Sequence, residues 1–439
     1  MIIIISKSQN NGEIIKNTDS YENYISTKYK VVLGTPQVHL ITIPTEIISI
    51  ANKDPYCKLK FRINEDDNSL DLEPLQVLSI KGKIKKLTLE TYFSPIDVIV
   101  FEGIEINIPS VKRGLDIRLT DYRLLASKRN IVLSALESSL YQSIDGGRTW
   151  TILYTLENKK NQFIRAHISK SSYILFDLQG NIYYKDIYSD TIEKSDTNLF
   201  GKIKPPFYHG IDSYNNTIVF GEYGVTNEEY RVFKSSDNGK TWTVVLNKLA
   251  PTEIRHFHSV NYNKHNNMWY LTSGDTDSQV RWWTSSNASN WTEINGVSNQ
   301  RYRTLNLLPI GYDEIIWGSD AINAISEICT AKLNDIVSTT KRIYNLPHTC
   351  WGMYGNSETL MAITSIEAQD NEDLKCGIYV SRDCGISWSA ILKCDVSNYD
   401  VNSGFRSILG INMDEEFLIS SKGLKDIDPI GMNIFLKIN

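Results

Sequence analysis

Short apolar runs separated by polar, turn-forming segments extend over most of the chain. Four of these runs are Leu140–Tyr141, Val232–Phe233, Trp282–Trp283 and Ile378–Tyr379, and each precedes a segment rich in Ser, Asp, Asn or Gly. After three of these segments a second apolar run begins, at Thr151, Thr243 and Ser389. Two apolar runs around such a segment indicate a strand, a tight turn and a second strand. Long helical periodicities are hard to find, so the pattern predicts an all-β protein.

The segments between the paired runs share the pattern Ser-x-Asp-x-Gly-x-Thr/Ser-Trp, and we call them box turns. Three are intact: Ser143, Asp145, Gly147 and Trp150; Ser235, Asp237, Gly239 and Trp242; and Ser381, Asp383, Gly385 and Trp388. A fourth, from Ser285 to Trp291, is worn and one residue shorter. The Asp can accept backbone N–H groups, the Gly can adopt positive φ, and the Trp can anchor the turn on its own repeat. This chemistry is structural rather than catalytic.

The spacing of the box turns predicts a repeat. Their first serines lie at 143, 235, 285 and 381, so two of the three steps are close to twice the third. Strand-like runs at Asn181–Asp186 and Ile328–Leu333 fill the two long gaps. The resulting six units have about the period of β-propeller blades.

A seventh unit follows between Phe405 and Ile438, with three predicted strands before the chain ends. A closed ring needs a fourth strand, because an open blade would leave an unpaired edge. Either Ile104–Ile108 or Leu115–Leu119 could supply it. We predict a seven-bladed propeller over residues 111–439, with six blades as the alternative.

Residues 1–110 contain no box turn and no matching period. Runs such as Tyr29–Leu33, Val38–Ile43, Lys58–Ile63 and Ile96–Phe101 predict a small, separate β-rich domain. We expect this domain to be an attachment or assembly module.

Composition and charge exclude several classes of partner. The net charge is −5 and the pI is about 5.9, which gives no global reason to bind nucleic acid or an anionic membrane. The apolar run Ile2–Ile5 is too short for a signal peptide, and no run approaches the ~18 residues of a membrane-spanning helix. We therefore expect synthesis in a cytoplasm. The six cysteines show no CxxC spacing, which indicates reduced thiols.

The box turns resemble the Asp boxes, or BNR repeats, of the sialidase superfamily, and the resemblance covers about three-quarters of the chain. It implies boxes between the third and fourth strands of a blade, on the face opposite the ligand site. Members include sialidases, other glycan-active enzymes, sorting receptors and binding proteins, some of them on bacteriophage particles. The sialidase Phe/Tyr-Arg-Ile-Pro motif is not matched, because Phe61-Arg62-Ile63-Asn64 lacks the Pro and lies about 80 residues before the first box.

The innermost strand of every proposed blade carries an Arg or His that would line the central channel. The candidate ligand-binding residues are Arg165, His167, His209, Arg255, His256, His258, Arg303, His348, Trp351 and Arg406, and Arg123 occupies the corresponding place in the first blade. Under one interpretation these side chains only fill the channel. Under the other, part of the ring binds an anionic or hydroxyl-rich ligand through Arg forks and stacked aromatic rings.

A metal site is a third use for the same strands. His256 and His258 alternate on one strand and could join His209, but the sequence supplies no matched carboxylate or Cys. We therefore predict no metal and no cofactor.

Loops between second and third strands should lie on the same face as these residues. They carry Glu222, Tyr223, Asp275, Asp277 and Asp320. A glycosidase needs two carboxylates about 5–9 Å apart. Glu222, Tyr223 and Asp275 are the catalytic candidates if the protein is an enzyme.

The leading functional hypothesis is a non-enzymatic binding or structural protein, an appendage or tail-associated component of a bacteriophage. Its N-terminal domain would contact other structural proteins, and its propeller would present a face to a glycan or a receptor on the host surface. We expect it in the virion, with the cytoplasm as the alternative, and a homo-oligomer is compatible with this role. The rival hypothesis is a glycoside hydrolase or lyase, sialidase-like, that acts on an acidic sugar. A third is a purely scaffolding propeller with nothing bound in the channel.

Overall fold

The computed structural model describes the strands of the N-terminal part and nearly all of the remainder. The described residues are 2–7, 25–31, 37–40, 47–52, 59–63, 70–72, 76–81, 86–91, 96–102 and 115–438, except 198–199, 227, 311–312, 322–324, 356–358, 368–374, 397–402 and 425–432. Helix in these residues is limited to α1 (Ile336–Thr339), the 3-10 turns Asp277–Gln279 and Gln300–Tyr302, and a 3-10 position at Phe200. None of the described helices is long and apolar enough to cross a membrane.

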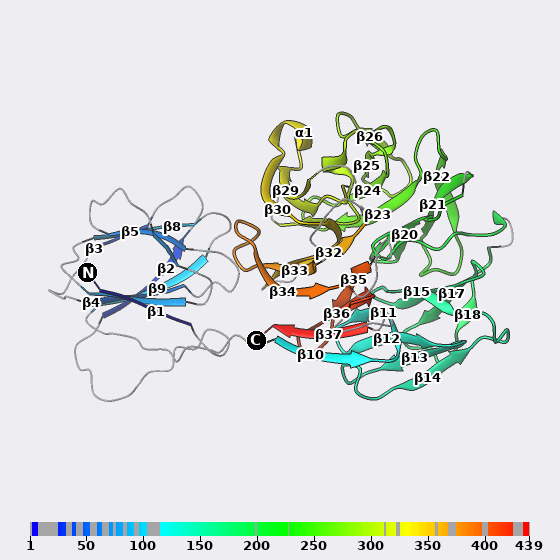
Figure 1. The fold of residues 1–439 in the computed structure, drawn as a ribbon, viewed down its shortest axis with the longest axis horizontal. Coiled ribbons are helices and arrows are strands. Elements are labelled where there is room, and N and C mark those ends of the chain that lie inside the picture. Colours follow the sequence, from blue (N-terminus) through cyan, green and yellow to red (C-terminus); the bar gives the residue numbers. More distant parts are fainter. Residues whose placement is uncertain are drawn as a thin grey trace.

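The first nine strands form two antiparallel sheets (Figure 1). One sheet has the order β1-β7-β4-β9-β2, and the other has the order β3-β8-β5-β6. The strands are β1 (Ile2–Lys7), β2 (Ile25–Val31), β3 (Gln37–Leu40), β4 (Ile47–Asn52), β5 (Leu59–Ile63), β6 (Leu70–Leu72), β7 (Gln76–Lys81), β8 (Lys86–Thr91) and β9 (Ile96–Glu102). Phe61, Leu87 and Leu89 bury one face of the smaller sheet. The β-rich prediction for this part is confirmed.

The remaining strands form seven four-stranded antiparallel blades in a ring (Figure 1). The first four blades are β11 (Arg123–Lys128), β12 (Ile131–Leu136), β13 (Ser139–Ser143) and β14 (Thr151–Thr155); β15 (Phe163–Ile168), β16 (Ser172–Asp177), β17 (Ile182–Asp186) and β18 (Glu193–Lys194); β19 (Ile211–Tyr214), β20 (Thr217–Gly221), β21 (Glu229–Ser235) and β22 (Thr243–Leu249); and β23 (His256–Asn263), β24 (Met268–Gly274), β25 (Arg281–Ser285) and β26 (Thr292–Ile294). The chain is an all-β propeller.

The last three blades complete the ring. They are β27 (Leu307–Pro309), β28 (Glu314–Gly318), β29 (Ser326–Lys332) and β30 (Lys341–Leu346); β31 (Thr349–Gly355), β32 (Leu360–Ile366), β33 (Lys375–Ser381) and β34 (Ser389–Asp395); and β35 (Ser403–Ile411), β36 (Glu416–Lys422), β37 (Asn433–Ile438) and β10 (Leu115–Thr120). Blades six and seven join in one sheet, because Ser365 and Ile366 of β32 also pair with β35.

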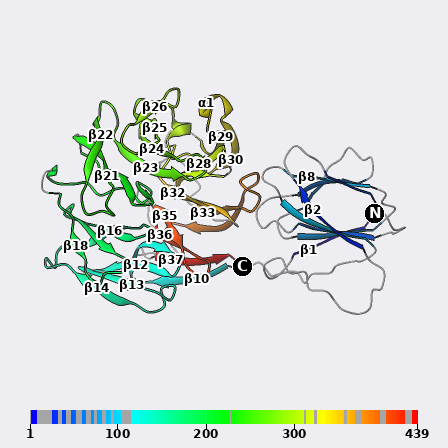
Figure 2. The same cartoon turned by 180° about the vertical axis from the view of Figure 1, so that it is seen from behind.

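β10 supplies the fourth strand of the seventh blade and so closes the ring. It is one of the two strands predicted for this place. It pairs antiparallel with β37 from Leu115 opposite Ile438 to Thr120 opposite Asn433, and the two strands lie side by side from behind as well (Figure 2). The other candidate, residues 104–108, lies outside the described residues. The seven-bladed prediction is confirmed.

The hydrophobic core is divided among the junctions between blades. One cluster of buried side chains fills each of the seven junctions, from the first and second blades round to the seventh and first. Successive blades thus bury their faces against each other, which is where apolar burial stabilises the ring.

The box turns have the expected hydrogen bonds and lie between the third and fourth strands. In the second intact turn, Asp237 Oδ1 accepts the Thr241 N–H at 3.0 Å, and the Gly239 N–H donates to Ser235 Oγ at 2.9 Å. The other two intact turns repeat this set. The Trp anchors pack on their own blade and on a neighbouring one: Trp242 meets Phe220 of β20 with ring centroids 5.0 Å apart. Trp242 lies in the cluster between blades two and three, beside Ile174 of β16.

Candidate functional site

The antiparallel order of each blade brings the predicted ligand residues to one face of the ring. The start of a first strand and the end of a second strand share one edge of the blade, while the turn between third and fourth strands lies at the other edge. The predicted Arg and His residues lie at or near the starts of β11, β15, β19, β23, β27, β31 and β35, except His167, which lies near the end of β15. We call this side of the ring the entry face. The box turns are on the opposite face.

An aromatic cluster spans the centre of the entry face. Phe207 and Tyr208 precede β19 in blade three, yet Phe207 contacts Trp351 of blade six, with ring centroids 5.9 Å apart. Leu305 and Tyr223 complete this central cluster. Because blades three and six are not neighbours in the ring, the cluster divides the entry face into two sides.

One side, the arginine side, carries three guanidinium groups around one phenol. Arg165 lies over the Tyr208 ring, 3.8 Å from its centroid, and Arg406 lies over the Trp351 ring at 5.1 Å. Burial alone would raise the pKa of Tyr208, but Arg165, Arg406 and Arg123 lower it to about 7. Among the described residues, no carboxylate pairs with Arg123, Arg165 or Arg406. This side therefore gathers three arginines without a carboxylate partner among the described residues, and they favour the ionised form of Tyr208.

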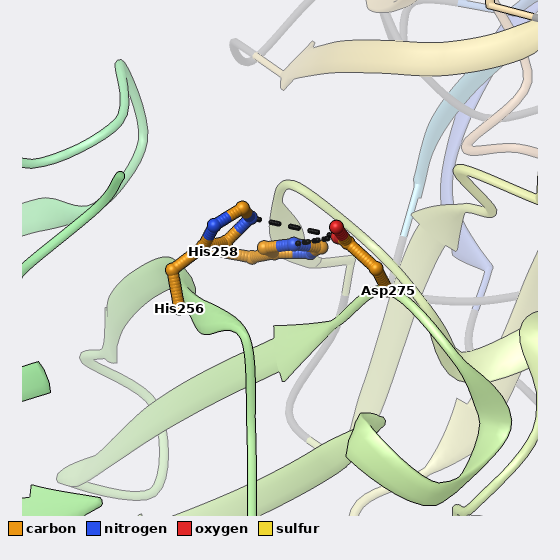
Figure 3. A group of neighbouring side chains, drawn as sticks. All are labelled: His256, His258 and Asp275. Carbon is orange, nitrogen blue, oxygen red and sulfur yellow. Dashed lines mark hydrogen bonds and ion pairs between the residues drawn. The ribbon is translucent and has the colours of Figure 1, made fainter. Parts of the chain in front are cut away.

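The other side, the carboxylate side, is built around Asp275 at the end of β24. The rings of His256 and His258 point at its carboxylate (Figure 3), with each Nε2 at 3.5 and 3.3 Å from Asp275 Oδ1. Arg255 Nη1 lies 2.9 Å from Oδ2. Burial alone would raise the pKa of Asp275, but the two histidines hold it well below its ordinary range. The carboxylate is therefore ionised.

Arg303 extends this cluster to two more carboxyl groups. Its Nη2 lies 3.4 Å from Asp275 Oδ1, 3.0 Å from Asp320 Oδ2 and 3.6 Å from Glu367 Oε1. Arg303 and Asp320 are almost fully buried. Burial raises the pKa of Asp320 well above its ordinary value and Glu367 raises it further, although Arg303 lowers it. The carboxylate side thus holds carboxyl groups whose proton affinities are driven in opposite directions.

β-Bulges and close glycine packing position these side chains. His258, Trp351 and Arg406 are each the extra residue of a bulge in the first strand of their blade, and bulges re-aim side chains next to functional sites. Gly274, the last residue of β24, faces His258 and Arg303 so closely that a Cβ would lie 2.7 Å from His258 Cε1. A side chain at 274 would displace both residues.

Several predicted residues do not belong to either side. Glu222, a catalytic candidate, is fully buried, and its two oxygens accept hydrogen bonds from Arg231 at 2.9 and 2.7 Å. This is the geometry of a structural ion pair, so Glu222 is not part of the site. His167 bonds Ser213 Oγ at 2.8 Å, and His209 reaches Ser407 of blade seven at 3.4 Å. These contacts favour the channel-filling interpretation for both histidines.

Three further predicted residues lie at the edge of the site. Tyr223 contacts His256, with ring centroids 4.0 Å apart, and burial raises its pKa. His348 is buried just before β31. Asp277 accepts a hydrogen bond from Gln300 at 3.1 Å on the exposed 3-10 turn.

Two residues of the site were missed by the sequence reasoning, Tyr208 and Glu367. Glu367 had a detectable signal, because an acidic residue follows the second strand in successive blades, as at Glu222, Asp275 and Asp320. In three blades the second strand also ends in Gly, at 221, 274 and 318. Tyr208 had no such signal, since its role depends on contacts across the ring.

No protein-family model matches the chain, and no curated protein matches it. Among solved structures, it is similar to YCF48 bound to a D1 peptide, at 14% identity and a TM-score of 0.49 over 75% of this chain and 99% of that one. It is also similar to the GH74 xyloglucanase from Xanthomonas campestris (10% identity, TM-score 0.47, 70% of this chain and 54% of that one). A third is oligogalacturonate lyase from Vibrio parahaemolyticus (11% identity, TM-score 0.46, 74% and 97%). Identities this low transfer neither activity nor ligand.

Proposed function

We propose that the protein is a binding β-propeller that holds an anionic ligand on the arginine side of the entry face. The observation that carries this proposal is the convergence of Arg123, Arg165 and Arg406 on Tyr208 without a carboxylate partner among the described residues. By contrast, Arg231, Arg255 and Arg303 all pair with carboxylates. The arginine side therefore has charge available for a ligand.

A carboxylate is the ligand group that this side suits best. Guanidinium groups bind carboxylates through two parallel N–H bonds, and a bound anion relieves the mutual repulsion of three nearby cations. The faces of Tyr208 and Trp351 lie beside the same arginines. Aromatic faces next to cations suit an acidic sugar, so the proposed ligand is a glycan that carries a carboxylate.

Glycan binding is the direct test. We expect the full-length chain to bind uronic- or sialic-acid oligosaccharides in preference to neutral ones of the same backbone. Arg165→Gln and Arg406→Gln should each weaken binding at least about tenfold, since a charge-assisted hydrogen bond contributes about 1.5–3 kcal/mol. Arg129→Gln, at an exposed turn, is the matched control and should bind normally. Equal affinity for neutral glycans, or no binding across the panel, would overturn the proposal.

We further propose that the box turns place the chain among the Asp-box propellers and that residues 1–110 attach it to a larger assembly. The hydrogen bonds of the three intact turns support the first point. A β-rich segment followed by a propeller suits an appendage or tail-associated component of a bacteriophage. Electron microscopy of particles labelled on the propeller tests this, and a chain found only as a free monomer would count against it.

A second candidate function is cleavage of an acidic sugar chain on the carboxylate side, either by hydrolysis or by β-elimination, as a lyase does. Asp275 and Asp320 touch the same nitrogen of Arg303, while their pKa values move in opposite directions. Paired carboxyl groups of this kind can serve as acid and base. Release of sialic or uronic acid from a fluorogenic panel, abolished by Asp320→Asn, would support it. Binding without turnover would contradict this second function and leave ligand binding as the supported one.

A further inference from the structure

We propose that His256, His258 and Asp275 bind a divalent transition-metal ion, for which Zn²⁺ has the fitting chemistry. The site goes beyond the ligand-binding function and does not depend on it, because the central aromatic cluster separates it from the arginine side. One ligand atom from each residue, the two Nε2 atoms and a carboxylate oxygen, all lie within 4.8 Å of one another.

The outer nitrogens of both imidazoles fix the state of the inner ones. His256 Nδ1 lies 2.5 Å from the carbonyl oxygen of Gly224, and His258 Nδ1 lies 3.2 Å from that of Thr304. A carbonyl oxygen accepts only from an N–H, so each Nδ1 carries the hydrogen. In the neutral rings both Nε2 atoms then present lone pairs to Asp275 (Figure 3). Histidine ligands of metals are held by the same outer hydrogen bonds.

The two ring nitrogens stabilise a carboxylate at this distance only when each carries a proton or when a metal ion lies between them and the carboxylate. Protonating both rings would supply positive charge as two separate N–H groups beside Arg255 and Arg303, whereas a metal ion supplies it at one point that all three ligand atoms share. His256 Nε2 is buried and makes no hydrogen bond among the described residues. A metal ion would satisfy both nitrogens and the carboxylate at once.

The two distances from the imidazole nitrogens to the carboxylate fit a tetrahedral ion, and the third distance, between the nitrogens, is at most 4.8 Å. Zn–N and Zn–O bonds of about 2.0–2.1 Å imply ligand atoms about 3.3–3.5 Å apart at the corners of a tetrahedron. The two Nε2 atoms lie 3.3 and 3.5 Å from Asp275 Oδ1. Two imidazoles with one carboxylate favour zinc-like ions over Mg²⁺ or Ca²⁺, which prefer oxygen ligands.

The surroundings make the site rigid and leave one coordination position open. His256 and His258 are almost fully buried, and Gly274 holds His258 in place by close packing. Arg303 and Arg255 are the nearest cations, and Glu367 lies 3.6 Å from Arg303 Nη2. Three protein ligands leave a fourth position for water or an anion, as in open zinc sites.

Metal binding by the untagged, full-length chain tests the proposal. The chain is stripped with a chelator, dialysed against Zn²⁺, and its metal content is measured by mass spectrometry. We expect one Zn²⁺ per chain. His258→Gln and Asp275→Asn should each weaken Zn²⁺ binding more than the 10–100-fold typical of losing an outer-shell partner. His167→Gln, a buried histidine that bonds Ser213, is the matched control and should bind Zn²⁺ like the wild type.

Two further measurements keep the test decisive. Co²⁺ in the site should give tetrahedral d–d absorption without thiolate charge-transfer bands, which separates it from cysteines such as Cys329 and Cys350. Zn²⁺ should raise the thermal midpoint of the wild type and of His167→Gln, but not that of His258→Gln. No bound Zn²⁺, retention of it in His258→Gln, or a thiolate spectrum would overturn the proposal. Glycan binding that survives metal removal would leave the arginine side unaffected.

Discussion

Glu222, Asp275 and Asp320 follow the second strands of three successive blades, and their neighbours give them different chemistry. Arg231 takes both oxygens of Glu222 and makes it part of the fold. Two histidines and Arg255 hold Asp275 ionised, whereas burial raises the pKa of Asp320. The three carboxylates occupy equivalent places after a second strand. Their different roles therefore come from the side chains that the next strand and the next blade place beside them.

The box-turn glycines are also constrained by residues of a neighbouring blade, so they should be sensitive to substitution. Gly239 has a φ of +91°, and a Cβ there would lie 2.2 Å from Ile174 Cδ1 of the preceding blade. Gly239→Ala should lower the free energy of unfolding by about 2–5 kcal/mol, through backbone strain and overpacking. Urea unfolding followed by Trp fluorescence measures it, since all nine Trp lie in the propeller. Gly201→Ala, also at positive φ but in open space, should cost only about 1–2 kcal/mol. Equal losses would contradict this account.

The sequence was sufficient for the residue types of the entry face but not for their partners. The place of His258 and Arg406 near the start of a first strand follows from the repeat. The bulges that re-aim them leave no mark in the apolar pattern, and the spacing of Asp275 in the chain does not show that it meets His256. Tyr208 acts across the ring, at a range that a local repeat does not encode.

Among the elements, β10 closes the ring with six residues. The repeat predicted it because a ring with three strands in its last blade needs a fourth. Its Arg118 reaches Glu416 of β36 at 2.7 Å and the carbonyl oxygens of Gly146 and Gly147 at 2.8 and 2.9 Å. The same guanidinium stacks on Phe435 of β37 at 3.7 Å. One side chain thus joins the closing strand to its own blade and to the first box turn.

Removing that side chain should loosen the closure. Arg118→Ala should lower the free energy of unfolding of the propeller by about 2 kcal/mol, because hydrogen bonds to charged groups contribute about 1.5–3 kcal/mol and this one is partly exposed. Arg148 lies in the same box turn and pairs with Asp414 at the surface, so Arg148→Ala should cost no more than about 1 kcal/mol. Urea denaturation compares the two variants. A loss for Arg118→Ala no greater than that for Arg148→Ala would show that β10 is held by its strand pairing alone.

At the scale of the whole molecule, the two faces of the ring have separate roles. The box-turn residues, from which the fold could be recognised, lie on one face. Their Trp side chains stabilise the junctions between blades. The charged residues gather on the other face, where the central aromatic cluster lies between the arginine side and the carboxylate side, whose arginines are paired with carboxylates. Blade number and closure were predictable because each repeat carries its own marks. This division was not, since it arises where distant blades meet.

The buried histidines of the ring should make the propeller acid-sensitive. Burial lowers the pKa of His167 to about 3 and that of His209 to about 4, so the unfolded chain binds protons that the fold does not. Their stabilisation is complete above about pH 6.5 and is lost as the pH falls towards 3–4. Asp212, whose pKa burial raises to about 6, has the opposite sign and is most stabilising in acid.

These opposing groups can be separated by the slope of stability against pH. Between pH 4.5 and 6, His167→Gln should reduce the rise in unfolding free energy with pH by about 1.4 kcal/mol per pH unit, the contribution of one proton. Asp212→Asn should make the rise steeper by a similar amount, whatever constant offset it adds. His265→Gln, in an exposed loop, should leave the slope unchanged. Trp fluorescence in urea at each pH gives the slopes, and a wild-type slope in His167→Gln would show that this ring is protonated within the fold.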